Sequence, residues 1–362
     1  MIRQKRLKIS VLVLVVLAVW LMVYSLFMTE QTMETIRTSL RVFIYSILPL
    51  LSVFSVCTKL LLKTNAFRKL LPVCGRSFLK SLGMSEAGFS VFLLGLFAGF
   101  PTGAMMLSEL CEKGEISSRE AESLLPFCNQ ASVAFLFGTL GKQILCDSRM
   151  GFVFFFAQTI TAMVCICLTA HDRYGYEDSR NIGEDSKISV ASALTLSVRE
   201  TTFSMLGVCG FFVFFSLVGT AVTDTLSVIG FPSGKLFYAM LGGILEMSSG
   251  FLLFSEGSFS SAIVLLGGGA LLGFGGISVF IQVIDRTESV FFAPRKYFEG
   301  KVLSGVLCSI FSGFFFFLYE RKGGKNLIIM ASVLIFLIFY LLNDVKIKFF
   351  SKKCGKIERN AV

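Results

Sequence analysis

Long apolar runs dominate the chain and decide what it can fold into. Each run of about 20 residues can cross a hydrocarbon core of roughly 30 Å as a helix. Hydrophobic residues make up 54% of the sequence and charged residues only 16%, which excludes an ordinary soluble protein. The sequence therefore predicts an all-α polytopic membrane protein with about eight transmembrane helices, at 9–28, 42–62, 118–141, 150–170, 202–223, 259–283, 301–319 and 326–343.

Two further apolar stretches, 86–110 and 236–256, are interrupted near their middle. The first contains Gly99-Phe100-Pro101-Thr102-Gly103, in which proline lacks an N–H and glycine tolerates unusual backbone shapes. The second contains Glu246-Met247-Ser248-Ser249-Gly250. Irregular backbone at membrane depth survives only where protein buries it or where it lines a wet cavity. We expect two re-entrant hairpins here, and the alternative is that both stretches cross, giving ten spans.

Basic residues indicate the orientation. They concentrate in residues 1–8, 63–80, 284–301 and the C-terminal tail, which lie on one side of the membrane in either topology. The positive-inside rule places both termini in the cytoplasm. The two topologies differ in where 171–201 lies, and its four basic residues favour the cytoplasmic side and hence the hairpins.

The chain matches itself at an offset of 147 residues over about 34 positions. In this register Gly103 aligns with Gly250, Ser108-Glu109 with Ser255-Glu256, and Cys128-Asn129 with Gly275-Gly276. Each half then contributes one broken hairpin and one interrupted helix. With hairpins that do not cross, the halves are two inverted repeats, which place a substrate near the bilayer midplane. The expected units are an N-terminal anchor (1–34), a first repeat (35–170), a polar loop (171–189), a second repeat (190–320) and a last transmembrane helix with a basic tail (321–362).

Glu246 is the sharpest candidate site residue, because an ionisable group in the middle of an apolar run is expensive. We interpret it as a coupling site for a proton or cation; the alternative is a protonated carboxyl bonded to nearby backbone. Asn129, Gln130 and Ser132 follow Pro126, where an interrupted helix can turn its positive end toward an anion. Their alternative role is as polar contacts between helices.

The other candidate substrate-binding residues lie at the breaks or near a membrane end. Hydroxyls and backbone at the breaks can donate hydrogen bonds, and Gln282 can reach the cavity. No nucleophile–base pair, phosphate-binding loop or zinc pattern occurs, so we expect no enzyme, no cofactor beyond coupling H⁺ or Na⁺, and no nucleic-acid partner. These remaining candidates are Pro101, Thr102, Gly103, Ser248, Ser249, Gly275, Gly276 and Gln282.

The stretch GFPTGAMMLSELCEKGEISSREAESLLPFCN resembles a known family, the nucleoside-recognition (Gate) domain membrane proteins, and among them the sporulation integral membrane proteins of the YlbJ type. The Gly-Phe-Pro-x-Gly-Ala break, the Lys-Gly-x-Ile-Ser loop and the Phe-Cys-Asn triplet carry the resemblance. The segments 273–279 (GFGGISV) and 297–301 (YFEGK) support it in the second half. The likeness covers roughly residues 35–320.

The resemblance implies a fold like that of the concentrative nucleoside transporters. It also implies a role in moving dipicolinic acid from the mother cell across the outer forespore membrane. Other sporulation membrane proteins are then candidate partners. The spans as delimited hold no Lys or Arg near their middle, so we expect helix ends and hydroxyls to receive the carboxylates. The alternatives are a membrane scaffold or regulator of spore envelope assembly without flux, and a nucleoside transporter by analogy of fold.

Overall fold

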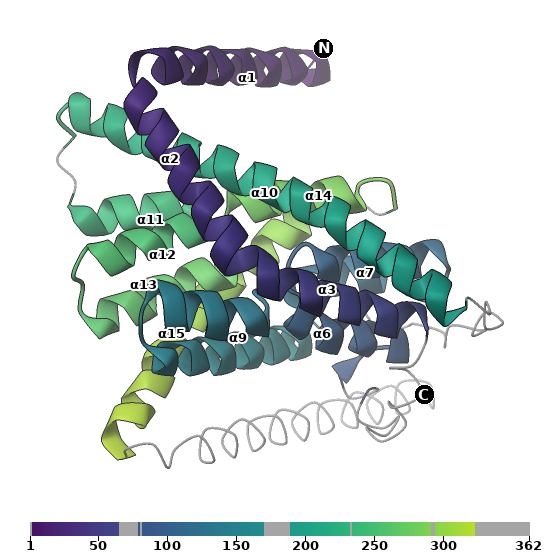
Figure 1. Ribbon diagram of the computed structural model, residues 1–362. Helices are drawn as coiled ribbons and strands as arrows, with labels where there is room; N and C mark the ends of the chain where they lie inside the picture. Colours follow the sequence, from purple (N-terminus) through teal and green to yellow (C-terminus); the bar gives the residue numbers. More distant parts are fainter. Residues whose placement is uncertain are drawn as a thin grey trace, which may run out of the picture.

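The computed structural model describes residues 2–64, 79, 82–169, 189–231, 234–290 and 294–322. Helices dominate these residues, and no β-strand occurs among them (Figure 1). Five helical stretches are long and apolar enough to cross a membrane: Thr29–Lys63, Ser148–Leu168, Val190–Val228, Ser261–Thr287 and Pro294–Leu318. They overlap with five of the predicted spans to within two residues of each predicted end or extend beyond it, so the prediction of a polytopic, all-helical membrane protein is confirmed.

The helices keep the order expected from the sequence. Predicted span 9–28 falls on the first helix, and 118–141 is divided between two helices. Predicted span 326–343, the basic tail, residues 65–78 and 80 of the basic segment and the polar loop up to residue 188 lie outside the described residues. The bounds are α1 Ile2–Phe27, α2 Thr29–Val42, the π-helix η1 Phe43–Ile47, α3 Leu48–Lys63, α6 Glu86–Ala98, α7 Thr102–Glu112, α8 Ser118–Cys128, the π-helix η3 Phe135–Ile144, α9 Ser148–Leu168, α10 Val190–Val228, α11 Lys235–Leu245, α12 Met247–Glu256, α13 Ser261–Phe274, α14 Ile277–Thr287 and α15 Pro294–Lys322.

Two amphipathic connectors, residues 29–41 and 190–201, precede the spans that the sequence predicts at 42–62 and 202–223, and in the structure each connector is fused to its span. Residues 29–63 run without a break through α2, η1 and α3, and α10 is one helix of 39 residues. No glycine or proline separates connector from span in either case, so nothing ends the helix. The two long helices lie side by side across the molecule (Figure 1).

These long helices are antiparallel. Lys63 forms an ion pair of 2.9 Å with Glu200 near one end. Thr35 and Thr220 lie 3.3 Å apart, Oγ1 to Oγ1, toward the other end. Rising residue numbers on one helix therefore meet falling numbers on the other. Lys63 also approaches Glu109 of α7 at 3.6 Å, which ties the first hairpin to both long helices.

Helix interruptions lie where the sequence predicts them. Helix α6 ends at Ala98, Gly99 takes a φ of 73° as its cap, and α7 begins after a cis Phe100–Pro101 peptide bond. Helix α11 ends at Leu245 and α12 begins at Met247, with Glu246 as the residue between them.

The second pair of interruptions also covers only a few residues each. Helix α8 ends at Cys128, and the chain is irregular through Ser132 before it becomes helical again. Helix α13 ends at Phe274, and Gly275 and Gly276 have φ of 86° and 88° before α14 begins. A side chain is strained at such angles, so glycine suits both positions.

The first hairpin packs tightly on the end of α8. A Cβ added to Gly95 or to Gly103 would lie only 2.2 Å from the carbonyl oxygen of Cys128. Both positions therefore need glycine for the close approach of backbone to backbone. This contact fixes the α6–α7 turn against the interruption at 129–132.

Candidate functional site

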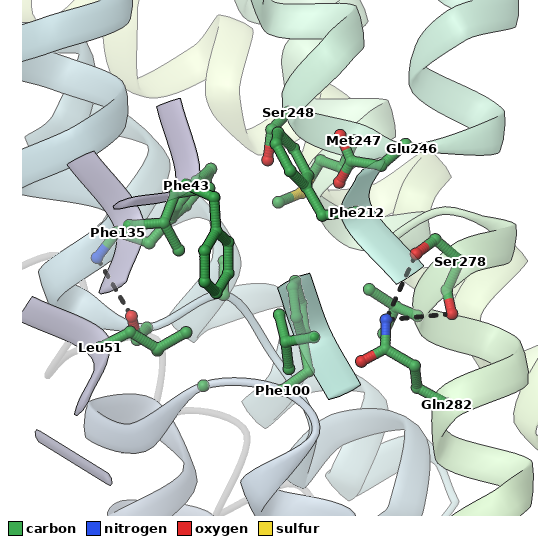
Figure 2. Close-up of a pocket in the computed structure, with 16 residues that line it drawn as sticks. Phe43, Leu51, Phe100, Phe135, Phe212, Glu246, Met247, Ser248, Ser278 and Gln282 are labelled. Atoms are coloured by element: carbon green, nitrogen blue, oxygen red, sulfur yellow. Dashed lines mark hydrogen bonds between the residues drawn. The ribbon is translucent and has the colours of Figure 1, made fainter. Parts of the chain in front are cut away.

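A cavity of about 50 Å³ lies where the interruptions meet (Figure 2). Each half of the chain supplies a long helix, a hairpin turn and the start of a helix after an interruption. The lining residues from the first half are Phe43, Ile47, Leu51, Gly99, Phe100, Ala131, Ser132 and Phe135, and those from the second are Val208, Phe212, Glu246, Met247, Ser248, Ser278, Val279 and Gln282.

The lining follows the 147-residue offset. Five residues of the first half each have a lining partner 147 positions later. The chemistry of the two walls nevertheless differs, because three of the five pairs have their polar side chain in the second half and one pair has it in the first half. The five pairs are Gly99 and Glu246, Phe100 and Met247, Ala131 and Ser278, Ser132 and Val279, and Phe135 and Gln282.

Glu246 supplies the one carboxylate among the lining residues, and it is only 6% exposed. Its Oε2 accepts hydrogen bonds from the backbone N of Ser249 at 2.8 Å and from the Ser249 hydroxyl at 3.2 Å. The carboxylate therefore caps the N-terminus of α12, where a negative charge is favoured. A carboxyl group of the chain itself thus occupies the N-terminus of α12.

Ser132, Ser278 and Gln282 add neutral polar groups to the cavity. The Gln282 amide donates to the carbonyl and hydroxyl oxygens of Ser278, both at 3.3 Å (Figure 2). Ser132 Oγ accepts from the backbone N of Phe135 at 3.0 Å. The rest of the wall is largely apolar. Four aromatic rings and six other apolar side chains supply it: Phe43, Phe100, Phe135, Phe212, Ile47, Leu51, Ala131, Val208, Met247 and Val279.

The structure brings four predicted site residues to the cavity: Ser132, Glu246, Ser248 and Gln282. The others are absent from the lining. Thr102 Oγ1 lies 3.4 Å from the Ser55 hydroxyl, and Ser249 Oγ lies 2.9 Å from the Ser216 hydroxyl. Those outside the lining are Pro101, Thr102, Gly103, Asn129, Gln130, Ser249, Gly275 and Gly276.

Asn129 and Gln130 take part in hydrogen bonds that support the interruption. Asn129 Nδ2 donates to the Tyr297 hydroxyl at 3.1 Å, and the Gln130 amide donates to the carbonyl of Phe127. Gln158 of α9 accepts from the backbone N of Ala131 at 3.2 Å and donates to its carbonyl at 2.9 Å. Side chains thus satisfy the backbone that the interruption leaves unpaired.

One basic residue lies deeper inside the protein than the sequence indicates. Lys301 is 2% exposed, and its Nζ donates to the Asn129 carbonyl at 2.7 Å. The span predicted at 301–319 begins with this lysine, whereas α15 begins at Pro294, about two turns earlier. The buried lysine therefore appeared to be a residue at the membrane surface.

No cluster of metal-binding side chains occurs within the described residues. Five membrane-length helical stretches, with interrupted helices meeting at a small, mostly apolar cavity that carries a few polar groups, define a polytopic integral membrane protein. The chain is 24% identical over 319 residues to the sporulation integral membrane protein YlbJ of Bacillus subtilis (strain 168), covering 78% of this chain and 77% of that protein. It is therefore a relative of the YlbJ type. No protein-family model and no solved structure matches the chain.

Proposed function

We propose that the protein is a secondary transporter for a small organic anion, with dipicolinic acid as the leading candidate. The observation that carries this proposal is the cavity, which four helix interruptions from two halves of the chain enclose. Discontinuous helices around a midplane cavity are typical of secondary transporters. A scaffold without flux has no need of such a site.

Antiparallel pairing of corresponding helices supports two inverted repeats. Helices α9 and α15 begin 146 residues apart, at Ser148 and Pro294. The Cys165 sulfur lies 4.0 Å from the Ser304 hydroxyl, and the rings of Phe156 and Phe315 are 6.4 Å apart. These contacts require that α9 and α15 run in opposite directions. The α2–α3 stretch and α10 are antiparallel as well.

Helix lengths support re-entrant hairpins. Helices α6, α7, α11 and α12 contain 13, 11, 11 and 10 residues. Each is therefore about 15–20 Å long, well short of a hydrocarbon core of roughly 30 Å. A Cβ added to Gly250 would lie 2.5 Å from the Gly243 Cα, so α12 folds back along α11 after Glu246.

The cavity lining favours entry of an anion together with a proton. Glu246 is the one titratable residue of the lining, and its negative charge repels an organic anion. Protonation of Glu246 removes that repulsion and frees the N-terminus of α12 for a substrate carboxylate. The cavity must also widen, because about 50 Å³ is too small for an aromatic dicarboxylate.

A nucleoside is the second candidate substrate. The absence of Lys and Arg from the lining, together with Gln282, three serines and four phenylalanine rings, suits a neutral heterocycle. Uptake of labelled dipicolinate and of labelled nucleosides into proteoliposomes distinguishes the two. Uptake of neither would refute transport of these solutes and favour the scaffold.

Glu246→Gln tests whether transport is coupled to a proton on Glu246. We expect this variant to exchange dipicolinate between equal concentrations across the bilayer but to lose uptake driven by a pH gradient. In cells, Glu246→Gln and Asn129→Ala should both abolish dipicolinate accumulation in spores at unchanged protein level. Wild-type accumulation in both variants would remove the site proposal.

A further inference from the structure

Lys301 is a buried basic residue that the proposed transport step does not use. Its Nζ lies 2.7 Å from the carbonyl oxygen of Asn129 and 5.8 Å from the centre of the Tyr297 ring. Tyr297 is itself 1% exposed, and its hydroxyl accepts from Asn129. A cation held at this depth is costly unless partners of opposite charge compensate it.

Two helix C-termini supply that compensation. Asn129 caps the C-terminus of α8, and Gly275 caps that of α13. A Cβ added to Gly275 would lie 3.9 Å from both Cε and Nζ of Lys301, so the second helix end also adjoins the lysine. Each helix C-terminus carries roughly half a negative charge, and two of them match one monovalent cation.

Unpaired oxygen atoms surround the same junction. Asn129 Oδ1 and Gln130 Oε1 are buried and accept no hydrogen bond from the described residues. The two side chains are 0% and 4% exposed. Carbonyl oxygens at the ends of half-helices are the groups with which transporters bind a coupling cation such as Na⁺. The junction therefore has the acceptors of a cation site, with the end of a lysine side chain in it.

We propose that Lys301 is a tethered cation that takes the place of a soluble coupling ion between α8 and α13. Its charge holds the two interrupted helices together, so this junction needs no metal ion. The consequence for transport rests on the proposed function: coupling would fall to the proton on Glu246. The structural part of the proposal concerns folding alone and is tested without substrate.

Thermal unfolding of the purified full-length protein, in sodium chloride and in choline chloride, provides the test. We expect wild type to unfold at the same temperature in both salts. Lys301→Ala should unfold at least several degrees lower in choline chloride, because the helix ends lose their counter-charge. Sodium or ammonium should restore part of that loss by entering the vacated space.

Lys296→Met is the matched control. Lys296 lies on the same helix, is exposed and pairs with Glu122 at 2.6 Å on the surface. This variant should behave as wild type in every salt, and Lys301→Met, which keeps length without charge, should resemble Lys301→Ala without rescue by sodium. Stabilisation of wild type by sodium over choline would overturn the proposal. So would wild-type stability of Lys301→Met, or a Lys301→Ala variant insensitive to every monovalent cation.

If neither Lys301 variant folds, the comparison of wild type in the two salts decides alone. Dipicolinate uptake at equal rates with and without external sodium is the further expectation for wild type. A protein that transports neither solute but shows the predicted salt responses would refute the proposed function and leave the tethered cation standing.

Discussion

Gly103→Ala tests the packing on which the site depends. The added methyl group would lie 2.2 Å from the Cys128 carbonyl oxygen and 2.9 Å from its carbon, where 3.4 Å or more is ordinary van der Waals contact. One of the two backbones must therefore move by about 1 Å. Because the carbonyl precedes Asn129, the displacement passes directly into the interruption beside the cavity.

The magnitude follows from two opposing effects. Forcing a methyl group into a packed interior costs about 1–3 kcal/mol. Alanine in place of glycine within a helix returns roughly 1 kcal/mol. Gly210→Ala isolates the second effect, since Gly210 lies in α10 and an added Cβ would meet nothing within 4 Å. The two variants should therefore differ by the cost of the clash, about 1–3 kcal/mol.

The assay is thermal unfolding followed by a thiol-reactive fluorophore. Cys128, Cys165 and Cys308 are buried and free, so they react as the protein opens. We expect Gly103→Ala to unfold a few degrees below Gly210→Ala. Unfolding of Gly103→Ala at or above the temperature of Gly210→Ala would refute the close approach of α7 to the end of α8.

Three further changes test other parts of the structure. Tyr297→Phe removes the acceptor of the Asn129 amide and should cost about 1–3 kcal/mol of stability, seen as a lower unfolding temperature. In single-cysteine variants, cytoplasmic labelling of Cys111 and external labelling of Cys146 would support the hairpin, and external labelling of Cys111 would contradict it. The Asp147 side chain caps α9, and hydrogen bonds from the Arg149 guanidinium hold the pKa of the Asp147 carboxyl below its ordinary value. The contribution of Asp147 to the free energy of unfolding should be complete above a pH of about 4 and be lost at lower pH. In Asp147→Asn, stability should therefore fall less steeply as the pH is lowered through this range.

The sequence predicts the helix interruptions well, because their causes are local. The Gly99-Phe100-Pro101 segment disfavours a continuous helix through its own backbone chemistry, and the capping-box sequence Ser117-Ser118-Arg119-Glu120 begins α8, with the Ser117 hydroxyl accepting from the Glu120 N at 3.2 Å. The fused connectors were missed because amphipathic and apolar residues can share one helix. Polarity changes along α10 without any signal that ends it.

The composition of the cavity could be predicted only in part. Glu246 is conspicuous in an apolar run, but Phe43 and Phe212 are ordinary apolar residues whose meeting depends on how distant helices pack. Lys301 was misread for a different reason. A span delimited by hydropathy begins or ends at charged residues, so Lys301 was assigned to the start of a span. In the structure Lys301 lies two turns inside α15, where it donates to the Asn129 carbonyl at the end of the interrupted α8.

The two longest helices have a consequence for the surrounding bilayer. Residues 29–63 and 190–228 form rods of 35 and 39 residues, about 52 and 58 Å long. Neither can stand upright within an apolar layer roughly 30 Å thick, so each must lean strongly or extend into the headgroups. Lipids with longer or shorter acyl chains would alter that lean and, through the Lys63 pairs with Glu200 and Glu109, pull on the first hairpin. Acyl-chain length thus becomes a mechanical input to this protein.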